Sequence, residues 1–227
     1  MRSQNDEKMF FYDKFAENFD RKMNMYDLNK RIQYIFQSLG NIQGKKLLDA
    51  GCGTGWFSKE ATERGAQVFS LDIGKNLLSQ VAAKCKTEKT AASVLEIPFF
   101  DDCFDIVISS EVIEHTVNPK GAIHEMHRVL KKDGVLALTV PNKIWHPAIL
   151  IANKLKVRPY EGYENWVGWN ELQEWLSRIG FNIDRIDGFH LFPFIFPFTY
   201  RLLSVMEKYS RLLGPFMLNI SVKAIKV

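Results

Sequence analysis

Two acids and a histidine lie close together in the segment Glu111-x-x-Glu114-His115. In a helical turn this spacing would bring Glu111 near both other side chains. Three interpretations remain open at this point. His115 can act as a general base, the three side chains can bind a divalent metal, or the acids can cap a helix while His115 packs. His146, farther along the chain, is a further candidate for chemistry.

A second feature is the series of glycines at alternate positions, Gly51, Gly53 and Gly55, after an apolar run that includes Asp49. Glycine lets the backbone turn tightly and lets a ligand approach it closely. The pattern G-x-G-x-G differs from the G-x-G-x-x-G of dinucleotide-binding loops, and the chain has no G-K-[ST] phosphate loop. The glycine loop therefore predicts a nucleoside-bearing ligand that has no pyrophosphate.

From Lys45 onward, short apolar segments alternate with amphipathic ones. We expect strands at 46–50, 67–71, 91–95, 104–109 and 135–140, and helices at 56–64, 76–84 and 119–130. This alternation predicts an α/β fold with a doubly wound, mostly parallel sheet. Such sheets bind ligands beyond the carboxyl ends of their strands. We therefore expect the glycine loop, Asp72, residues 93–95 and Glu111 to meet at that edge.

Two further regions flank this core in what we expect to be a single domain, residues 1–227. Residues 1–40 are aromatic and helical in pattern, which predicts an N-terminal helical cap over the ligand edge of the core, 45–140. Residues 141–227 form the acceptor side, with a helix at about 170–178 and a hairpin-like pair of strands at 181–187 and 216–226.

An insert, residues 188–215, separates these two final strands. Its first half is strongly aromatic, with Phe-Pro-Phe-Ile-Phe-Pro-Phe at 192–198. Its second half is amphipathic and predicts a helix with one apolar side. That side contains Leu202, Val205, Met206, Tyr209 and Leu213, opposite Arg201, Glu207 and Lys208.

The motifs together resemble those of class I S-adenosylmethionine-dependent methyltransferases, most of all the ubiquinone-pathway O-methyltransferase type. Residues 47–55 resemble the first family motif. The segments 97–105, 111–115 and 128–134 (Arg-Val-Leu-Lys-Lys-Asp-Gly) look like later ones. The resemblance covers roughly residues 10–140. It implies a seven-stranded, Rossmann-like sheet, S-adenosyl-L-methionine as the methyl donor and S-adenosyl-L-homocysteine as the product.

The resemblance also implies which side chains contact the cofactor. Asp72 would bind the ribose hydroxyls, while Asp49 and Glu111 would place negative charge near the cationic end. Ser93 stands where many relatives have an aspartate for the adenine amino group, and its hydroxyl can accept that hydrogen bond more weakly. The expected cofactor residues are Tyr12, Asp49, Gly51, Cys52, Gly53, Gly55, Asp72, Ile73, Ser93, Val94, Leu95 and Glu111.

Similar E-x-x-E-H segments occur in ubiquinone-pathway O-methyltransferases and in metal-dependent methyltransferases that act on RNA 3′ ends. The metal-dependent enzymes use another histidine, which the loosely corresponding residues 161–169 lack. A divalent metal is therefore not favoured, and we expect no metal ligands. The expected catalytic residues are His115, Glu114 and His146.

Composition limits the partners and the location of the protein. The net charge of +4 is mild and its basic residues are scattered, so nucleic acid is not the favoured partner. Three cysteines without a C-x-x-C pair, and a polar N-terminus without a secretory signal, predict a cytoplasmic protein. No apolar stretch reaches the roughly 18–20 residues that a membrane span requires.

The methyl acceptor must be inferred from the aromatic insert. This segment could form a greasy pocket, a homodimer surface or a peripheral contact with a membrane. The leading hypothesis is O-methylation of a hydrophobic small molecule, such as a quinone precursor, a lipid or a glycolipid. The alternatives are a methyltransferase for RNA or another polar acceptor, and a noncatalytic cofactor-binding module.

Overall fold

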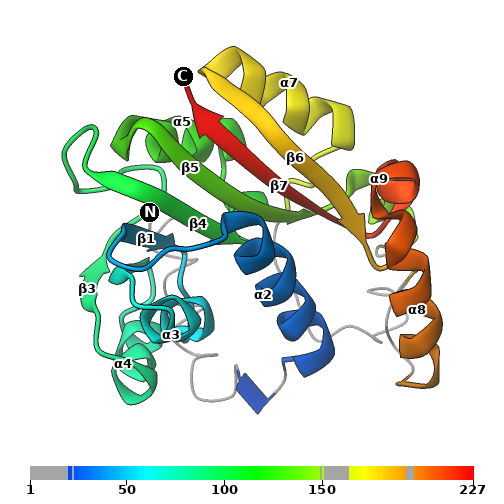
Figure 1. Ribbon diagram of the computed structural model, residues 1–227, viewed down its shortest axis with the longest axis horizontal. Coiled ribbons are helices and arrows are strands. Elements are labelled where there is room, and N and C mark those ends of the chain that lie inside the picture. The colour runs from blue at the N-terminus through cyan, green and yellow to red at the C-terminus, as the bar shows by residue number, and fades with distance from the viewer. Residues whose placement is uncertain (1–19, 22, 149, 151–163, 193–196) are drawn as a thin grey trace, which may run out of the picture.

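A computed structural model describes residues 20–21, 23–148, 150, 164–192 and 197–227. Tyr12 and most of the aromatic run 192–198 lie outside these residues. The described chain forms a seven-stranded sheet in the order β3-β2-β1-β4-β5-β7-β6, with helices on both faces (Figure 1). Its strands are β1 (Lys46–Ala50), β2 (Gln67–Asp72), β3 (Glu88–Ala91), β4 (Phe104–Ser110), β5 (Leu130–Pro141), β6 (Phe181–Phe189) and β7 (Asn219–Lys226).

Strands β1 to β5 pair in parallel, whereas β7 runs antiparallel to both of its neighbours, β5 and β6. The prediction of a doubly wound, mostly parallel sheet is thus confirmed, as is the hairpin-like final pair. The helices of the described chain are α2 (Met25–Leu39), α3 (Trp56–Glu63), α4 (Lys75–Lys84), α5 (Pro119–Val129), α7 (Trp169–Ile179), α8 (Tyr200–Met206) and α9 (Ser210–Leu213).

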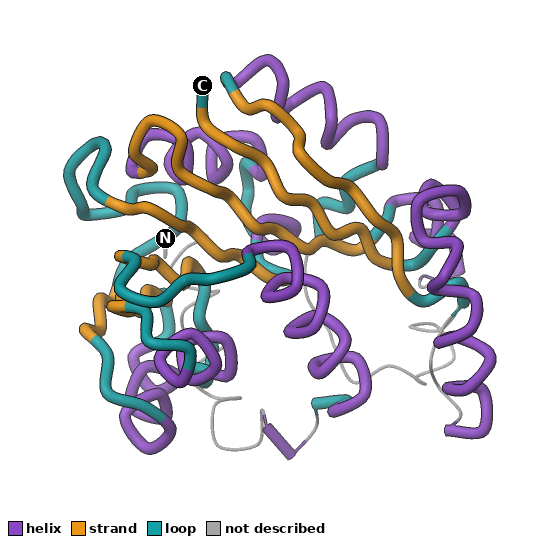
Figure 2. The backbone as a smooth tube through the Cα atoms, in the orientation of Figure 1, coloured by secondary structure: helices purple, strands orange, loops and turns teal. Residues whose placement is uncertain are grey.

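Helices cover both faces of the central strands, and successive side chains of each strand point to opposite faces. Leu47 and Ile108 pack in a core with α2 and α3, whereas Leu48 and Val107 pack in a core with α5 and α7. Figure 2 shows these helices in layers on either side of the orange strands. With both faces covered, a ligand can reach the central strands only at an end of the sheet.

The third strand lies earlier than predicted. β3 comprises Glu88–Ala91, and the predicted strand at 91–95 is instead a turn that follows it. β3 is an edge strand whose residues are mostly exposed, so it carries no apolar run that sequence periodicity could detect. The apolar side chain of Val94 is buried in the turn, where it packs against the core.

β5 also begins earlier than predicted. Leu130 already pairs with Phe104 of β4, and the register then jumps so that Val135 pairs with Ile106. Asp133 and Gly134, which directly precede the predicted strand at 135–140, therefore lie in a bulge inside the strand, with Asp133 at a φ of +61°. The glycine and the acid signal a local bend in the chain, but the pairing continues on both sides of it.

The second half of the insert faces the opposite way from the expectation based on its amphipathic pattern. Leu202, Val205 and Tyr209 are exposed, whereas Leu203 is fully buried. Glu207, one turn after Leu203, also points inward and forms an ion pair with Lys30 of α2. This partly buried ion pair holds Glu207 toward α2, and hydropathy alone cannot anticipate it. Of the helices in the described chain, none combines the length and apolar character needed to cross a bilayer.

Candidate functional site

The glycine loop joins β1 to α3 at the carboxyl end of the sheet. Gly51, Gly53 and Gly55 all adopt left-handed conformations, with φ values of +82°, +53° and +91°. The Gly51 N–H donates to the carbonyl of Leu71 at 2.8 Å, so the loop is fastened to the end of β2. A Cβ atom on Gly51 would lie 2.5 Å from the methyl carbons of Val112. Only glycine meets both demands at this position.

Asp72 ends β2 and lies against the glycine loop. One of its carboxylate oxygens accepts the N–H of Gly53 and the other accepts the N–H of Gly74, both at 2.8 Å. Asp72 is buried and the adjacent Ile73 is half-buried. Two backbone donors therefore hold this carboxylate in one orientation.

Asp49 lies inside the protein, beneath the glycine loop. The Ser58 hydroxyl donates to its carboxylate at 2.6 Å and lies 2.7 Å from the hydroxyl of Ser70. Burial raises the pKa of Asp49 to about 7, and the hydrogen bond from Ser58 only partly opposes this rise. Burial likewise raises the pKa of the neighbouring Cys52 thiol well above its usual range, so this cysteine stays protonated.

The turn after β3 brings residues 93–95 beside Asp72, because the Ala92 N–H donates to the Asp72 carbonyl at 3.0 Å. Within the turn, the Ser93 hydroxyl accepts the N–H of Leu95 at 3.2 Å. Val94 is buried, and Leu95 packs half-buried against the same core. Residues 93–95 form a turn where a strand was predicted, yet they still lie at the carboxyl end of the sheet, as expected. The Ser93 hydroxyl retains a hydrogen atom that it can donate.

Glu111 follows β4 in a strained, left-handed conformation with a φ of +55°. Its N–H donates to the Thr139 carbonyl at 3.0 Å, and the side-chain amide of Asn219 donates to its carboxylate at 3.3 Å. Burial raises the pKa of Glu111 to about 7, with the positive charge of Arg31 opposing the rise. Glu111 therefore precedes the short helical turn Ile113–His115 instead of forming part of it as predicted.

Glu114 and His115 lie in the short 3-10 turn Ile113–His115 that follows. Glu114 is buried, and its Oε2 atom has no hydrogen-bond partner among the described residues. Its other carboxylate oxygen lies 3.8 Å from Nε2 of His115. Burial, and next the nearby Glu111, raise the pKa of Glu114 well above its ordinary value. A buried acid thus adjoins an imidazole that solvent still reaches.

His146 lies nearby but is linked to this pair through other residues. Its ring is 5.6 Å from the ring of Trp166. The neighbouring Asn165 donates through its backbone N–H to the Glu114 carbonyl at 2.6 Å. Its side-chain amide donates to the Thr116 carbonyl at 2.7 Å. Residues 165–166 therefore connect His146 to the turn that carries the acid–histidine pair.

Arg31 and Asn219 reach the site although the sequence patterns did not single them out. Arg31 extends from α2, where Asp27 binds its Nε at 2.9 Å, and its Nη1 donates to the Ser110 hydroxyl at 3.4 Å. Spacing could have suggested the Asp27–Arg31 pair, since the two residues are one helical turn apart. The approach of the Arg31 guanidinium to the end of β4 depends on how α2 packs across the sheet, which spacing does not show.

The charges at this edge fit the chemical groups of S-adenosylmethionine. Two fixed carboxylates, on Asp72 and Glu111, suit a diol and a cationic end, and Arg31 suits a carboxylate. The apolar side chains of Ile73, Val94 and Leu95 suit a flat base. Within the described ranges, no group of three or more His, Cys, Asp or Glu side chains is placed to hold a metal ion.

Comparison with known proteins agrees with this geometry. Residues 48–138 match the methyltransferase domain family. The ubiquinone biosynthesis O-methyltransferase of Glaesserella parasuis is 29% identical over 179 residues, which cover 72% of this chain and 76% of that protein. The enzyme of the same name from Alkalilimnicola ehrlichii is 32% identical over 66% of each chain.

A solved structure provides a further comparison. The magnesium protoporphyrin IX methyltransferase of Synechocystis PCC 6803, crystallised with bound S-adenosylhomocysteine, superimposes with a TM-score of 0.67 at 16% sequence identity. The match covers 97% of this chain and 100% of that one. At this identity the similarity shows a common fold.

Proposed function

The chain belongs to the S-adenosylmethionine-dependent methyltransferases, and we propose that it methylates an oxygen atom of an apolar small molecule. One observation carries this proposal, namely the 3.8 Å separation of the His115 imidazole from the buried Glu114 carboxyl. An oxygen acceptor must lose a proton during transfer, whereas a neutral amine can react without a base. An imidazole at the end of β4 therefore matches the chemistry of a hydroxyl acceptor.

For the cofactor, we assign the ribose hydroxyls to Asp72 and the adenine to the apolar side chains around Leu95. The amino-acid end would lie between Arg31 and Glu111, with the carboxylate toward the guanidinium and the ammonium toward the carboxylate. When bound, S-adenosylmethionine supplies an activated methyl group on a sulfonium. The protein has to fix its position and exclude water.

For the proton, we assign His115 as the acceptor and Glu114 as the residue that orients its ring. Burial raises the pKa of Glu114, which favours the neutral form of a carboxyl group that lies beside the imidazole. His146 would contribute from the other side of Trp166 as a contact to the acceptor. Tyr12 remains a proposed cofactor contact of the N-terminal cap.

The apolar character of the acceptor is supported by the surface of the insert. Leu202, Val205 and Tyr209 on this segment are exposed, together with Ile144 near the end of β5. We propose that the acceptor enters beside these exposed apolar side chains. The names of the O-methyltransferase relatives favour a quinone precursor over a lipid or glycolipid. A peripheral membrane contact or a homodimer would use the same surface.

A substitution pair tests the proton acceptor. We expect His115→Ala to lower kcat with a phenolic acceptor by about a hundredfold or more, the usual contribution of a positioned base. His124→Ala is the matched control because His124 is exposed on α5, and it should leave kcat unchanged. Full activity of His115→Ala would contradict the assignment.

The acceptor class is tested by a separate screen. The purified protein would be offered radiolabelled S-adenosylmethionine with phenolic, lipid and RNA extracts, each with and without EDTA. We expect labelling of the phenolic or lipid fraction that EDTA leaves intact. Labelling of RNA alone would overturn the apolar-acceptor proposal. Inhibition by EDTA would indicate that the reaction depends on a divalent metal.

A further inference from the structure

A cluster of charged side chains is buried between α2 and the insert. At its centre is His190, which is completely buried directly after β6. Its Nε2 lies 3.3 Å from a carboxylate oxygen of Asp27, and its Nδ1 lies 3.6 Å from one of Glu207. Lys30 completes the cluster with a 2.6 Å ion pair to Glu207. The imidazole therefore lies between an acid of α2 and an acid of the insert.

The backbone shows that this placement is constrained. His190 has a φ of +58°, a conformation that costs free energy for any residue with a Cβ atom. Its carbonyl accepts the N–H of Leu218 at 2.8 Å, which ties it to the start of β7. Tyr26 of α2 also stacks on Tyr200 of the insert, with ring centroids 3.8 Å apart. In Figure 1, α8 stands beside α2 at the same end of the sheet.

Two routes lead from His190 to the end of β4. Along one, Asp27 contacts His190 through one oxygen and holds Arg31 with the other at 2.9 Å. Arg31 then donates to the Ser110 hydroxyl beside Glu111. Along the other, Leu218 precedes Asn219, whose amide donates to the Glu111 carboxylate. The insert is thus linked, through Asp27 and through the start of β7, to both charged groups that flank the proposed amino-acid end of the cofactor.

We propose that His190 is a positioning residue that acts through Asp27 to hold Arg31 at the Ser110–Glu111 corner. Docking of the insert on α2 would then set how tightly the amino-acid end of S-adenosylmethionine is bound. This inference rests on the proposed role of Arg31. It assigns to the insert a part in cofactor recognition, in addition to any contact that the insert makes with the acceptor.

The test compares two ligands by calorimetry. S-adenosylhomocysteine carries the carboxylate and ammonium, whereas 5′-methylthioadenosine has the same base, ribose and thioether without them. Asparagine suits a left-handed backbone. We expect His190→Asn to lower the affinity for S-adenosylhomocysteine by about fivefold, while the affinity for methylthioadenosine changes by less than about twofold. Unchanged binding of S-adenosylhomocysteine, or an equal loss for both ligands, would overturn the proposal.

Three further variants sharpen the result. His190→Gln can still donate to Asp27 and should keep the ratio of the two affinities within about twofold of wild type. Tyr34→Phe is the matched control, since Tyr34 stacks on Phe189 at the same interface, and it should not change the ratio. If Arg31→Met also leaves the ratio intact, the proposed role of Arg31 fails as well. If Arg31→Met lowers the ratio but His190→Asn does not, only the positioning role is lost.

Discussion

The two halves of the ligand edge are built in different ways. The half that we propose binds the cofactor, around β1 and β2, is held by hydrogen bonds from backbone N–H groups between segments close in sequence, such as that from the Gly53 N–H to the Asp72 carboxylate. The other half, where α2 meets the insert, is held by side chains far apart in sequence, such as Lys30 and Glu207, which are 177 positions apart. A local motif can encode the first arrangement, whereas the second exists only once the chain has folded.

The difference also affects how each half responds to change. Backbone donors in a glycine loop have one geometry, so a single added methyl group disrupts them. Ion pairs among long side chains tolerate rearrangement, and their contribution depends on burial. We therefore expect the largest effects of substitution in the glycine loop and the smallest on the outer face of the insert.

Gly51→Ala should have the largest effect. The new methyl group would overlap Val112 at 2.5 Å, and alanine is strained at a φ of +82°. Together these effects should lower the free energy of unfolding by about 3 kcal/mol. Urea unfolding of the ligand-free protein measures the loss. The same substitution in a Val112→Ala background should cost less, and equal costs in both backgrounds would show that the overlap is not its cause.

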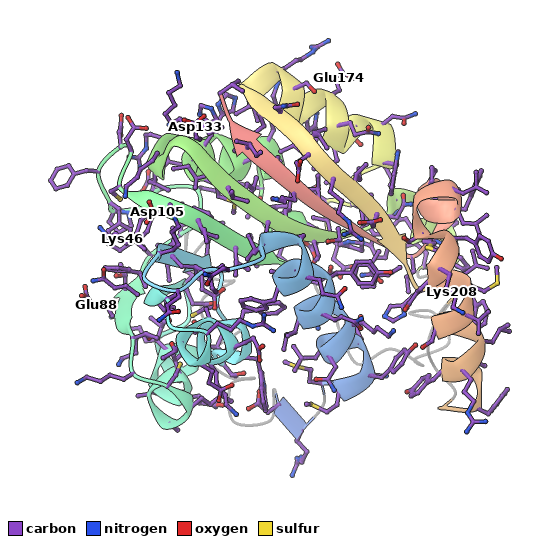
Figure 3. The ribbon with its side chains drawn as sticks, in the orientation of Figure 1. Lys46, Glu88, Asp105, Asp133, Glu174 and Lys208 are labelled. Atoms are coloured by element: carbon purple, nitrogen blue, oxygen red, sulfur yellow. The ribbon has the colours of Figure 1, made fainter. Side chains whose placement is uncertain are left out.

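Asp72→Asn comes next. An amide has one acceptor oxygen in place of two, so it leaves one backbone N–H unpaired. The affinity for S-adenosylhomocysteine should fall about thirtyfold, which corresponds to about 2 kcal/mol of binding free energy. Asp105→Asn is the matched control, because Asp105 also accepts a backbone N–H, that of Lys46, at 2.8 Å. Figure 3 shows that pair on the opposite side of the molecule from Lys208 of the insert. Calorimetry should show full affinity for the control, and equal losses would contradict the assignment of Asp72.

The pH dependence of stability tests the buried acid beneath the loop. The pKa of Asp49 in the folded protein is about 7, above its ordinary value of 3.8, so ionisation of this side chain opposes folding. Its contribution to stability is complete below about pH 4 and is lost as the pH rises through about 7. Between about pH 6 and pH 8 the loss should be about 1 kcal/mol. Asp49→Asn should remove this part of the slope in denaturant titrations, while the part from Glu111, whose pKa is also raised to about 7, should remain. An unchanged slope would contradict the assignment to Asp49.

The smallest effect is expected on the outer face of α8. Leu202 is 53% exposed, so Leu202→Ser should change the free energy of unfolding by less than about 0.5 kcal/mol. The adjacent Leu203 is fully buried, and Leu203→Ala should cost about 2–3 kcal/mol. Thermal unfolding of both variants measures the contrast. Equal losses would mean that the outer face is covered by another part of the protein.

Sequence patterns predicted most of the sheet because its central strands are buried on both faces and end in glycine or acid. β1 and α3 were located to within a residue of their observed bounds. The edge strand β3 was misplaced, since an exposed strand need not be apolar. The second half of the insert was predicted as a helix with one apolar side. In the structure Glu207 points inward, and most of that apolar side is exposed.

For the proposed site, type and spacing predicted that the glycines, Asp72 and Glu111 lie at the carboxyl ends of their strands, where the structure has them. Their chemical environment was not predictable. The raised pKa of Glu111 and the orientation of Arg31 depend on which helix covers the end of β4. In the sequence, His190 stands in the aromatic half of the insert and no pattern singles it out. Folding places it between two carboxylates.

The sequence by itself determined the fold and the conformation of the glycine loop, because these depend on local backbone geometry and on alternating burial, and its motifs indicated the donor of the methyl group through their resemblance to a family. Only the tertiary structure decided which charges face one another across α2 and the insert. Electrostatic interactions and pKa values depend on distance and burial in three dimensions. The chain fixes those quantities when segments such as 27–31, 190 and 207 come together.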